Sequence, residues 1–332
     1  MSPATAATAA LDTRVAEQAL PRYGFGPEHT LRMINLSENA TFLVHDDDRS
    51  AVLRVHRVGY HTRADIESEL SWLAALREES GVATSRVLPN TDDELVTTVV
   101  VDGVERHAVL FDVVPGTEPD EIALGTSDFE TLGTITAQMH QHARGWTPPP
   151  GFHRFSWDWE HTLGDTPRWG RWQDGIDVGP VEETALGAAV QVVRERLSSY
   201  GTEPDRFGLV HADLRLANLL VEGDLVTVID FDDCGLSWFM YDFGTAVSFI
   251  EHDPRLPDWQ AAWLRGYRSV TDLSSEHEAM LTTFVMLRRL LLVAWMGSHA
   301  HSRECQELGP GYTANSVELA RRYVASDGAS IS

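Results

Sequence analysis

Cysteine is scarce in this sequence of 332 residues, which contains only Cys234 and Cys305. Two cysteines cannot build a disulfide framework or a cysteine-based metal cluster. A chain without such a framework is typical of a reducing compartment, so we expect a cytoplasmic protein. Cys234 itself is expected to be a small packed side chain rather than a reactive group.

Long apolar runs are also missing. The longest, Leu290–Met296, follows two arginines and is far too short to span a bilayer. The first residues, MSPATAATAALDTR, lack the basic start and the apolar core of a signal peptide. The sequence therefore predicts a protein with no membrane span, no secretion signal and no membrane partner.

Positive charge is in short supply as well, because 50 acidic residues against 26 basic ones give a formal net charge of −24. This balance argues against nucleic acid and anionic membranes as partners, since both need a basic footprint. It would attract a cationic small molecule. The alternative is that the acidity only keeps the protein soluble. A hydrophobic content of 43% supports a sizeable core in one large or two moderate domains.

What the chain does contain is a dense pattern of polar residues among apolar runs in its second half. Two β-rich runs flank a Glu-Gly-Asp turn, which is the signature of a tight β-hairpin. Polar side chains that can bind a metal or accept a proton precede and follow this hairpin. In chain order the pattern comprises His211, Asp213, Asn218, the turn Glu222-Gly223-Asp224, Asp230 and Asp242.

A hairpin brings its two ends together, so Asn218 before it and Asp230 after it should lie side by side. Asp213, in the loop just upstream, should face the same space. Carboxylate and carboxamide oxygens suit Mg²⁺. Transfer of a γ-phosphoryl group needs little more than a metal on the phosphate oxygens and an acceptor hydroxyl held in line. The pattern therefore predicts a phosphoryl-transfer site, with Asp213 accepting the hydroxyl proton.

These residues resemble the motifs of protein kinases, in which H-R-D is followed by four residues and N, and later by D-F-G. Here the motifs read His211-Ala212-Asp213 and Asp230-Phe231-Asp232. The departures are similar to the aminoglycoside phosphotransferase family, which also takes in homoserine kinases, choline kinases and bacterial stress-response kinases, and in which His-Gly-Asp is usual. The resemblance implies ATP and Mg²⁺ as cofactors. It also implies Asp213 as the catalytic base, Asn218 and Asp230 as metal ligands, and Asp242 as a carboxylate that supports the loop.

The resemblance further implies an α+β, two-lobed, protein-kinase-like fold, with a small antiparallel N-lobe that carries one helix and a larger, mainly helical C-lobe. The pattern along the chain agrees with this. We place an ATP-covering lobe at residues 1–115 and a catalytic and substrate-binding lobe at residues 116–332. The predicted strands are Thr30–Leu36, Ala40–Val44, Ala51–Val55, Glu94–Val101 and Arg106–Val113.

Helical periodicity of apolar residues predicts the other elements. A frayed tail is expected up to about residue 12, because its residues are small. Ser127 and Glu130 have the spacing of a capping box, which predicts a helix start. The predicted helices are Thr13–Leu20, Asp65–Glu79, Ser127–Ala143, Val181–Ser199, Asp258–Val270, Glu276–Gly297 and Ala314–Val324.

Arg54, in the third predicted strand, occupies the place of the lysine that holds the α- and β-phosphates in the resembled family. Glu69 lies beside the apolar stripe of the next helix and could pair with Arg54, and Glu67 is the competing candidate. No Gly-rich GxGxxG loop joins the first two strands. Ser37 and Asn39 lie there instead and could offer backbone N–H groups to phosphate. An ordinary turn is the alternative.

The strand that ends in LFDVVPG resembles the hinge of the family, whose backbone hydrogen-bonds adenine. The positions that match it are Phe111, Asp112 and Val113. Such contacts use backbone atoms, so the side chains do not distinguish ATP from GTP.

Residues 145–180 contain five of the ten tryptophans, with carboxylates between them. A long, loop-rich segment inside a compact domain is more often a lid or a binding element than an idle connector. We therefore expect Trp157 and Asp158, together with Asp232 of the second motif, to contact a polyol, an amine or a cationic sugar. The alternative is that the tryptophans only pack the core.

The sequence thus predicts an ATP-dependent phosphotransferase that acts on a hydroxyl of a small molecule, such as an aminoglycoside-like antibiotic, an amino alcohol or a metabolite. The main alternative is a Ser/Thr protein kinase of the stress-response type. Two other classes stay open. One is a catalytically inactive nucleotide-binding module, because Arg54 replaces lysine. The other is a metal-dependent hydrolase built on Asp230, Asp232 and Asp233 with His211.

Overall fold

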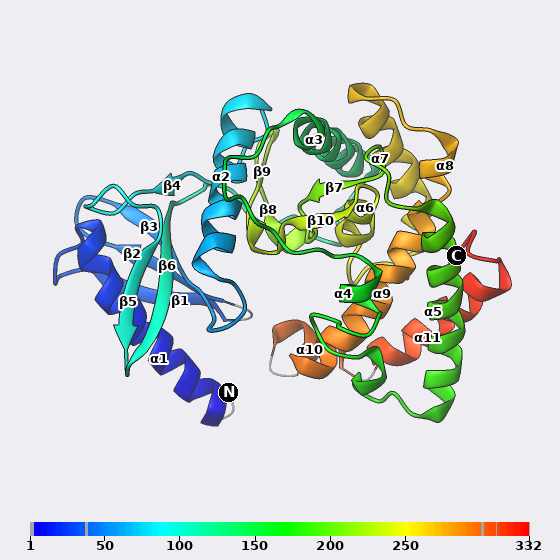
Figure 1. Cartoon of the computed structure of the whole chain (residues 1–332), viewed down its shortest axis with the longest axis horizontal. Coiled ribbons are helices and arrows are strands. Elements are labelled where there is room, and N and C mark those ends of the chain that lie inside the picture. Colours follow the sequence, from blue (N-terminus) through cyan, green and yellow to red (C-terminus); the bar gives the residue numbers. More distant parts are fainter. Residues whose placement is uncertain (1–2, 37–38, 300–301, 310, 332) are drawn as a thin grey trace.

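The computed structural model describes residues 3–36, 39–299, 302–309 and 311–331. Two lobes lie side by side along the long axis of the molecule, the first built on a β-sheet and the second mainly helical (Figure 1). This is the α+β arrangement that the sequence predicted. The predicted lobe boundary at residue 115 falls in the segment between β6 (Val104–Asp112) and α3 (Thr126–Gly145).

The first lobe is organised around a six-stranded antiparallel sheet in the order β1-β2-β3-β6-β4, with β5 paired to β6. Alternate residues of β2, such as Phe42 and Val44, are buried in the lobe's core. In β3 this alternation breaks, because Arg54 is buried between Leu53 and Val55 and points to the other face of the sheet. The strands are β1 (Thr30–Leu36), β2 (Ala40–His45), β3 (Ser50–Val55), β4 (Val87–Leu88), β5 (Thr97–Val101) and β6.

The N-terminal helix α1 packs against this sheet, mainly on β5 (Figure 1). The frayed tail predicted up to residue 12 is wrong, because α1 runs from Pro3 to Ala19. Alanine is the strongest helix former, and the small residues that suggested fraying are mostly alanines. Asp12 of α1 also forms a buried ion pair with Arg106 of β6, with 2.5 Å between Oδ1 and Nη2.

Helix α2 (Arg63–Glu79) lies between the sheet and the second lobe (Figure 1). It begins with a capping box, in which the Thr62 hydroxyl accepts the Asp65 N–H and the Asp65 carboxylate accepts the Thr62 N–H. Trp72 of α2 meets Phe231 of the second lobe edge to face, with 5.6 Å between ring centroids. Helix α2 therefore contributes an aromatic contact between the two lobes.

The second lobe packs its helices around α9 (Leu281–Ser298), which is buried almost throughout. The stretch Ser275–Ser298 is long and apolar enough to cross a membrane, but 89% of its apolar window is buried inside the lobe. Two short antiparallel sheets belong to this lobe: the hairpin β8–β9 lies on the side toward the first lobe, and the pair β7–β10 lies deeper, beside α6 (Figure 1). The remaining elements are α4 (Trp159–Thr162), α5 (Pro180–Tyr200), β7 (Phe207–Val210), β8 (Leu219–Glu222), β9 (Leu225–Val228), β10 (Gly235–Trp238), α6 (Tyr241–Ala246), α7 (Leu256–Val270), α8 (Ser275–Glu278), α10 (Arg303–Leu308) and α11 (Gly311–Ala325).

Most predicted helix ends differ from the structure by one to three residues, and two predictions differ in kind. The helix predicted over Glu276–Gly297 is interrupted at Ala279 and Met280, which separate α8 from α9. The predicted capping box of Ser127 and Glu130 does not form. Helix α3 begins one residue earlier, and the Asp128 carboxylate instead accepts the Gly125 N–H at 2.8 Å.

Candidate active site

The loop that follows β7 is held by one buried carboxylate, Asp242 at the start of α6. Asp242 accepts the backbone N–H of His211 at 3.1 Å and that of Ala212 at 2.8 Å. His140 of α3 contacts the same carboxylate through Nε2 at 3.0 Å. Asp242 thus supports the catalytic loop, as the resemblance implied, and His140 has a packing role rather than a metal-binding one.

Ala212 occupies the position at which the resembled family usually carries glycine, and its backbone shows why. Its φ is +65°, in the left-handed region that glycine adopts without a steric cost. The two N–H bonds to Asp242 and the 3.4 Å contact of the Ala212 carbonyl with Arg288 hold this conformation. The loop therefore stores backbone strain next to Asp213.

The hairpin brings Asn218 and Asp230 together as predicted. Strands β8 and β9 pair from Leu219 with Val228 outward, and the Ile229 N–H donates to the Asn218 carbonyl at 3.0 Å. The Asn218 side chain donates through Nδ2 to the Asp213 carboxylate at 2.7 Å and to its carbonyl at 2.8 Å. Asp213, Asn218 and Asp230 therefore converge at one end of the hairpin.

His211 joins the loop to the hairpin. Its Nδ1 accepts the Asp213 N–H at 3.2 Å, and its Nε2 lies 3.2 Å from the Ile229 carbonyl, to which it donates. Burial lowers the pKa of His211, and this outweighs the opposite effect of Asp242 and Asp213. Both ring nitrogens of His211 are thus occupied, which argues against the hydrolase in which it would bind a metal.

Arg288, in the middle of α9, is a site residue that the sequence reasoning missed. It is 2% exposed on its side chain, and its Nη2 forms an ion pair with Oδ1 of Asp213. Its Nε donates to the Ser248 hydroxyl at 2.9 Å. Burial would raise the pKa of Asp213, but Arg288, Arg215 and His211 lower it below its usual range. The predicted base is therefore ionised at neutral pH. An arginine pair inside an apolar run was its only signal in the sequence.

Asp230 follows β9 with a φ of +59°, and its side chain is 46% exposed, so an ion from solvent can reach it. Burial raises the pKa of Asp230 to about 7, with Asp232 and Glu69 adding to the rise and Arg54 opposing it. A divalent cation would favour the ionised form. Asp230 and the carboxamide oxygen of Asn218 form the hard-oxygen donor set that suits Mg²⁺.

Arg54 of β3 pairs with Glu69 of α2 through one nitrogen, Nη2, which lies 2.8 and 2.7 Å from the two carboxylate oxygens. The structure thus selects Glu69, since Glu67 pairs with Arg63 on the outer face of α2. Burial would lower the pKa of Arg54, but Glu69, Asp232 and Asp230 raise it above its usual value. The sequence contains no lysine, so Arg54 supplies the positive charge at the position where the family carries its phosphate-binding lysine.

The segment predicted to contact phosphate lies partly outside the described residues, because Ser37 is not among those that the structure describes. Asn39 is described, and its side chain forms hydrogen bonds with other residues of the protein. It donates to the Asp232 carboxylate at 2.7 Å and accepts the Arg57 N–H at 3.1 Å. A backbone contact of Asn39 with phosphate stays a prediction.

The hinge residues lie along β6 and its end. Phe111 is buried under the Arg54 guanidinium, 5.1 Å from ring centroid to Cζ, and Val113 is exposed. The Asp112 N–H donates to the Arg86 carbonyl at 2.9 Å, so this N–H is not available to adenine. Adenine contacts through the other backbone groups of these residues stay a prediction.

Asp232 points into the first lobe rather than toward an acceptor. Its carboxylate lies 3.1 Å from Nε2 of His61, 3.6 Å from Nδ1 of His56 and 3.9 Å from Nη1 of Arg54. Burial would raise its pKa, but His61 and Arg54 hold it well below the usual range. The prediction that Asp232 contacts the substrate is therefore wrong, because its charge is already balanced by side chains of the first lobe.

The predicted substrate contacts in the tryptophan-rich segment also need correction. Trp157 is fully buried, and its Nε1 donates to the Asp233 carbonyl at 2.8 Å, so it packs the core. The Asp158 carboxylate caps α4 by accepting the His161 N–H at 3.0 Å. Trp169 is the tryptophan of this segment that borders the junction of the lobes, in a pocket of about 340 Å³ that Tyr60 also lines.

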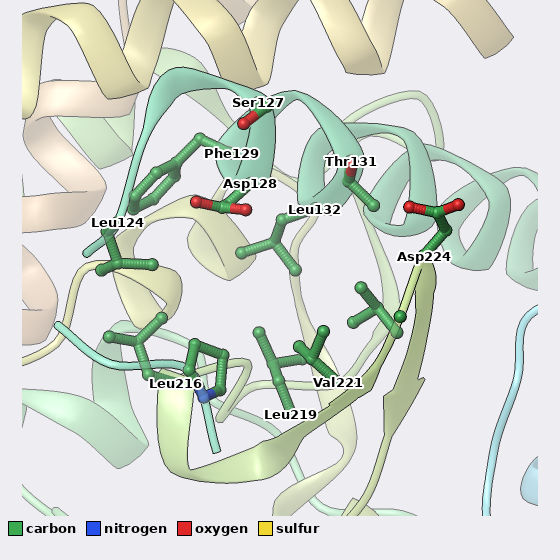
Figure 2. Close-up of a pocket in the computed structure, with 13 residues that line it drawn as sticks. Leu124, Ser127, Asp128, Phe129, Thr131, Leu132, Leu216, Leu219, Val221 and Asp224 are labelled. Atoms are coloured by element: carbon green, nitrogen blue, oxygen red, sulfur yellow. The ribbon is translucent and has the colours of Figure 1, made fainter. Parts of the chain in front are cut away.

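A second pocket, of about 290 Å³, lies between the hairpin and α3 (Figure 2). Its labelled side chains are mainly apolar, with Leu219 and Val221 from β8 opposite Phe129 and Leu132 from α3. Leu219 directly follows Asn218 in the chain. The pocket therefore lies between α3 and β8, the strand that begins directly after the predicted metal ligand Asn218.

The family that this fold and site define is confirmed by comparison with known proteins. The model of the phosphotransferase enzyme family, APH, matches residues 31–279, and the chain belongs to this family. It is thus a phosphotransferase, a kinase that acts on a small molecule. The two-lobed, kinase-like fold class is confirmed with it.

Individual kinases are similar to this chain in sequence and in structure. The solved structure of a microcompartment-associated aminopropanol kinase is 56% identical, covers 96% of this chain and 100% of its own, and superposes with a TM-score of 0.90. Amicoumacin kinase of Bacillus subtilis is 24% identical over 85% of this chain and 83% of its own. The structure of an amicoumacin kinase in complex with AMP-PNP, Ca²⁺ and Ami, at 21% identity and a TM-score of 0.77 over 95% and 93% of the two chains, shares the fold.

Proposed function

We propose that the protein transfers the γ-phosphoryl group of ATP to the hydroxyl of a small amino alcohol of the aminopropanol class. The observation that carries this proposal is the 56% identity to an aminopropanol kinase over nearly the whole of both chains. The proposal narrows the substrate set that the sequence left open. It also favours a small-molecule acceptor over the hydroxyl of a protein.

In the proposed reaction Asp213 accepts the proton of the acceptor hydroxyl as the oxygen attacks phosphorus. Arg288 keeps this carboxylate ionised, and Asn218 fixes its direction. Asn218 and Asp230 would hold Mg²⁺, which when bound neutralises charge on the phosphate oxygens. Arg54, oriented by Glu69, would contact the α- and β-phosphates.

The charge of the protein supports a cationic acceptor. A formal net charge of −24 raises the local concentration of a positively charged amino alcohol near the surface. This electrostatic attraction should weaken as salt screens it. A cytoplasmic location, in line with the scarcity of cysteine, is part of the same proposal.

A panel of acceptors with coupled detection of ADP tests this function. The panel contains 1-amino-2-propanol, ethanolamine, choline, homoserine, amicoumacin and kanamycin, each with ATP or GTP and Mg²⁺, and Asp213→Ala serves as the inactive control. We expect the highest kcat/KM with 1-amino-2-propanol and ATP. A higher kcat/KM for amicoumacin would indicate an antibiotic kinase instead of an amino alcohol kinase. ATP binding without turnover of any acceptor would contradict the proposal.

A further inference from the structure

We propose that the pocket of about 340 Å³ at the junction of the lobes binds the phosphate group of a small molecule, between Arg57 of the first lobe and Arg168 of the second. Neither Asn218 nor Asp230, the predicted metal ligands, lines this pocket. Small phosphate esters are the compounds that the proposed reaction forms. The site is inferred from the two arginines, whereas a phosphate ester made by this enzyme as the ligand rests on the proposed function.

The lining of this pocket has the opposite charge to the protein as a whole. Arg57 and Arg168 line it together with His299, and the described residues around it include no aspartate or glutamate. The whole chain, by contrast, has 50 acidic residues against 26 basic ones. A concave surface that carries only basic side chains attracts anions and repels cations. The pocket is therefore suited to an anionic ligand.

Arg168 is half-buried and has no acceptor for its guanidinium in the part of the chain that the structure describes. Its Cζ lies 3.6 Å from the centroid of the Phe155 ring, and the rings of Tyr60 and Trp157 lie 5.6 and 5.4 Å away. Ring faces attract the cation but accept none of the N–H bonds at its edge. A buried donor without a partner is costly, and Nε of Arg168 is such a donor. An anion in the pocket would supply the missing acceptor.

Arg57 supplies a second guanidinium from the other lobe. It lies in the connection between β3 and α2, where its backbone N–H donates to the Asn39 carboxamide at 3.1 Å. This bond fixes the main chain, whereas the exposed side chain forms no ion pair with any described residue. Arg57 can therefore turn its guanidinium toward a ligand without breaking a contact within the protein.

Trp169 joins the segments that line the pocket. Its indole Nε1 donates to the Tyr60 hydroxyl at 3.1 Å, which links it to the connection between β3 and α2. Its carbonyl accepts the Ser298 hydroxyl at 3.0 Å, which links it to the end of α9. The walls of the pocket are thus fixed before a ligand arrives, and this lowers the entropy lost on binding.

A phosphate group suits this pair of arginines better than a carboxylate. A phosphate monoester carries close to two negative charges at neutral pH, one for each guanidinium. Guanidinium groups bind phosphate oxygens through paired, charge-assisted hydrogen bonds. A carboxylate has a single charge, which one arginine already balances. A volume of about 340 Å³ is near the lower limit for ligand sites, so we expect a small ester or a free phosphate ion.

Calorimetric titration with inorganic phosphate and with O-phosphoethanolamine tests this site. The protein is first saturated with AMP-PNP and Mg²⁺, so that the nucleotide site is filled, and potassium chloride keeps the ionic strength constant. We expect the wild type to bind at least one of the two probes at one further site. Arg57→Gln and Arg168→Gln should each weaken this binding by about tenfold or more, because each removes a charge-assisted hydrogen bond.

Arg171→Gln is the matched control. Arg171 is exposed in the same segment as Arg168 but does not line this pocket, so its loss should leave the affinity within about twofold. A similar loss in all three variants would show that only the overall charge matters. Unchanged affinity in Arg57→Gln and Arg168→Gln would mean that the phosphate binds elsewhere. Either result overturns the site, and so does a wild type that binds neither probe.

The two probes distinguish the sources of the phosphate group. Tighter binding of O-phosphoethanolamine supports a site for a phosphate ester, and equal or tighter binding of inorganic phosphate supports a site for the free ion. A protein that binds a probe through Arg57 and Arg168 but phosphorylates no amino alcohol contradicts the proposed function and leaves the site intact. If Arg168→Gln fails to fold, Arg57→Gln at its exposed position decides the question.

Discussion

Arg288 of α9 and Asp213 of the catalytic loop lie 75 positions apart in the sequence and form a buried ion pair. The pair joins α9, a long and largely buried helix of the second lobe, to the residue that we predict to accept the substrate proton. A base that is paired in this way stays ionised well into acidic pH, because the arginine favours the charged carboxylate. The buried residue Arg288 thus keeps Asp213 in its ionised form.

Replacing Arg288 with glutamine should move the acidic limb of the kcat/KM profile to higher pH. Asp213 must be ionised to accept the proton, and Arg288 lowers its pKa. Without the arginine, Asp213 becomes protonated at a higher pH, so the activity is lost at a higher pH. The variant should also lose about 3–5 kcal/mol of stability, since it breaks a buried ion pair. A pH–rate profile with urea unfolding measures both effects.

Arg289→Gln is the matched control for this variant. Arg289 is the next residue of α9, is equally buried and pairs with Glu251 at 2.6 Å. We expect a similar loss of stability with an unchanged acidic limb. A shift of the acidic limb of the kcat/KM profile in both variants would show that general destabilisation, and not the charge beside Asp213, controls the pH dependence.

Ala212→Gly should stabilise the protein by about 1 kcal/mol, because glycine adopts a φ of +65° without the steric cost that alanine bears there. Urea unfolding at constant pH measures this change. Ala189→Gly, at a buried position inside the regular helix α5, should instead destabilise by about 1 kcal/mol or more. Destabilisation by both substitutions would mean that the loop at Ala212 is not strained.

Glu69→Gln should weaken nucleotide use by about tenfold in kcat/KM for ATP, because it removes the partner that orients Arg54. Glu67→Gln lies on the same helix but pairs with exposed Arg63, so it should have no more than a twofold effect. Arg54→Lys should resemble Glu69→Gln, since lysine cannot contact Glu69 with one nitrogen and Asp230 with another. Steady-state kinetics with varied ATP compare the three, and equal effects of the two glutamate changes would refute the assignment of Glu69.

The affinity for Mg²⁺ with nucleotide should fall as the pH falls through about 7. Asp230 has a pKa raised to about 7 and must lose its proton to bind the metal. Between pH 8 and pH 6 we therefore expect a loss of about tenfold in affinity, by titration calorimetry with a non-hydrolysable nucleotide. In Asp230→Asn the affinity should be lower and nearly independent of pH, and a wild type with the same affinity at both pH values would contradict the assignment.

The sequence was most informative where local pairing decides the geometry. The convergence of Asn218 and Asp230 follows from the tight turn between β8 and β9, whose two sides are close along the chain. The pairing of Arg54 with the adjacent helix was predictable for the same reason. The choice between Glu67 and Glu69 needed the orientation of α2 relative to the sheet, which the structure supplies.

Contacts between distant segments could not be predicted in this way. Nothing in the local sequence of Arg288 indicates that its partner is Asp213, since the packing of α9 against the loop decides this. In the tryptophan-rich segment the sequence suggested aromatic contacts without showing which ring faces inward. Trp157 is fully buried, whereas Trp169 reaches the junction of the lobes. The first part of α1, before the predicted helix Thr13–Leu20, was missed because small residues suggest fraying and helix formation alike.

Turnover of 1-amino-2-propanol by Asp213→Ala, measured together with ATP affinity, tests the central claim most directly. Our account predicts that the wild type forms the phosphate ester of the alcohol, and that the variant loses about 10² to 10⁴ in kcat while its ATP affinity stays near that of the wild type. Detection of the product by ³¹P NMR identifies the bond that is formed. A variant that turns over the alcohol at the wild-type rate would contradict the account.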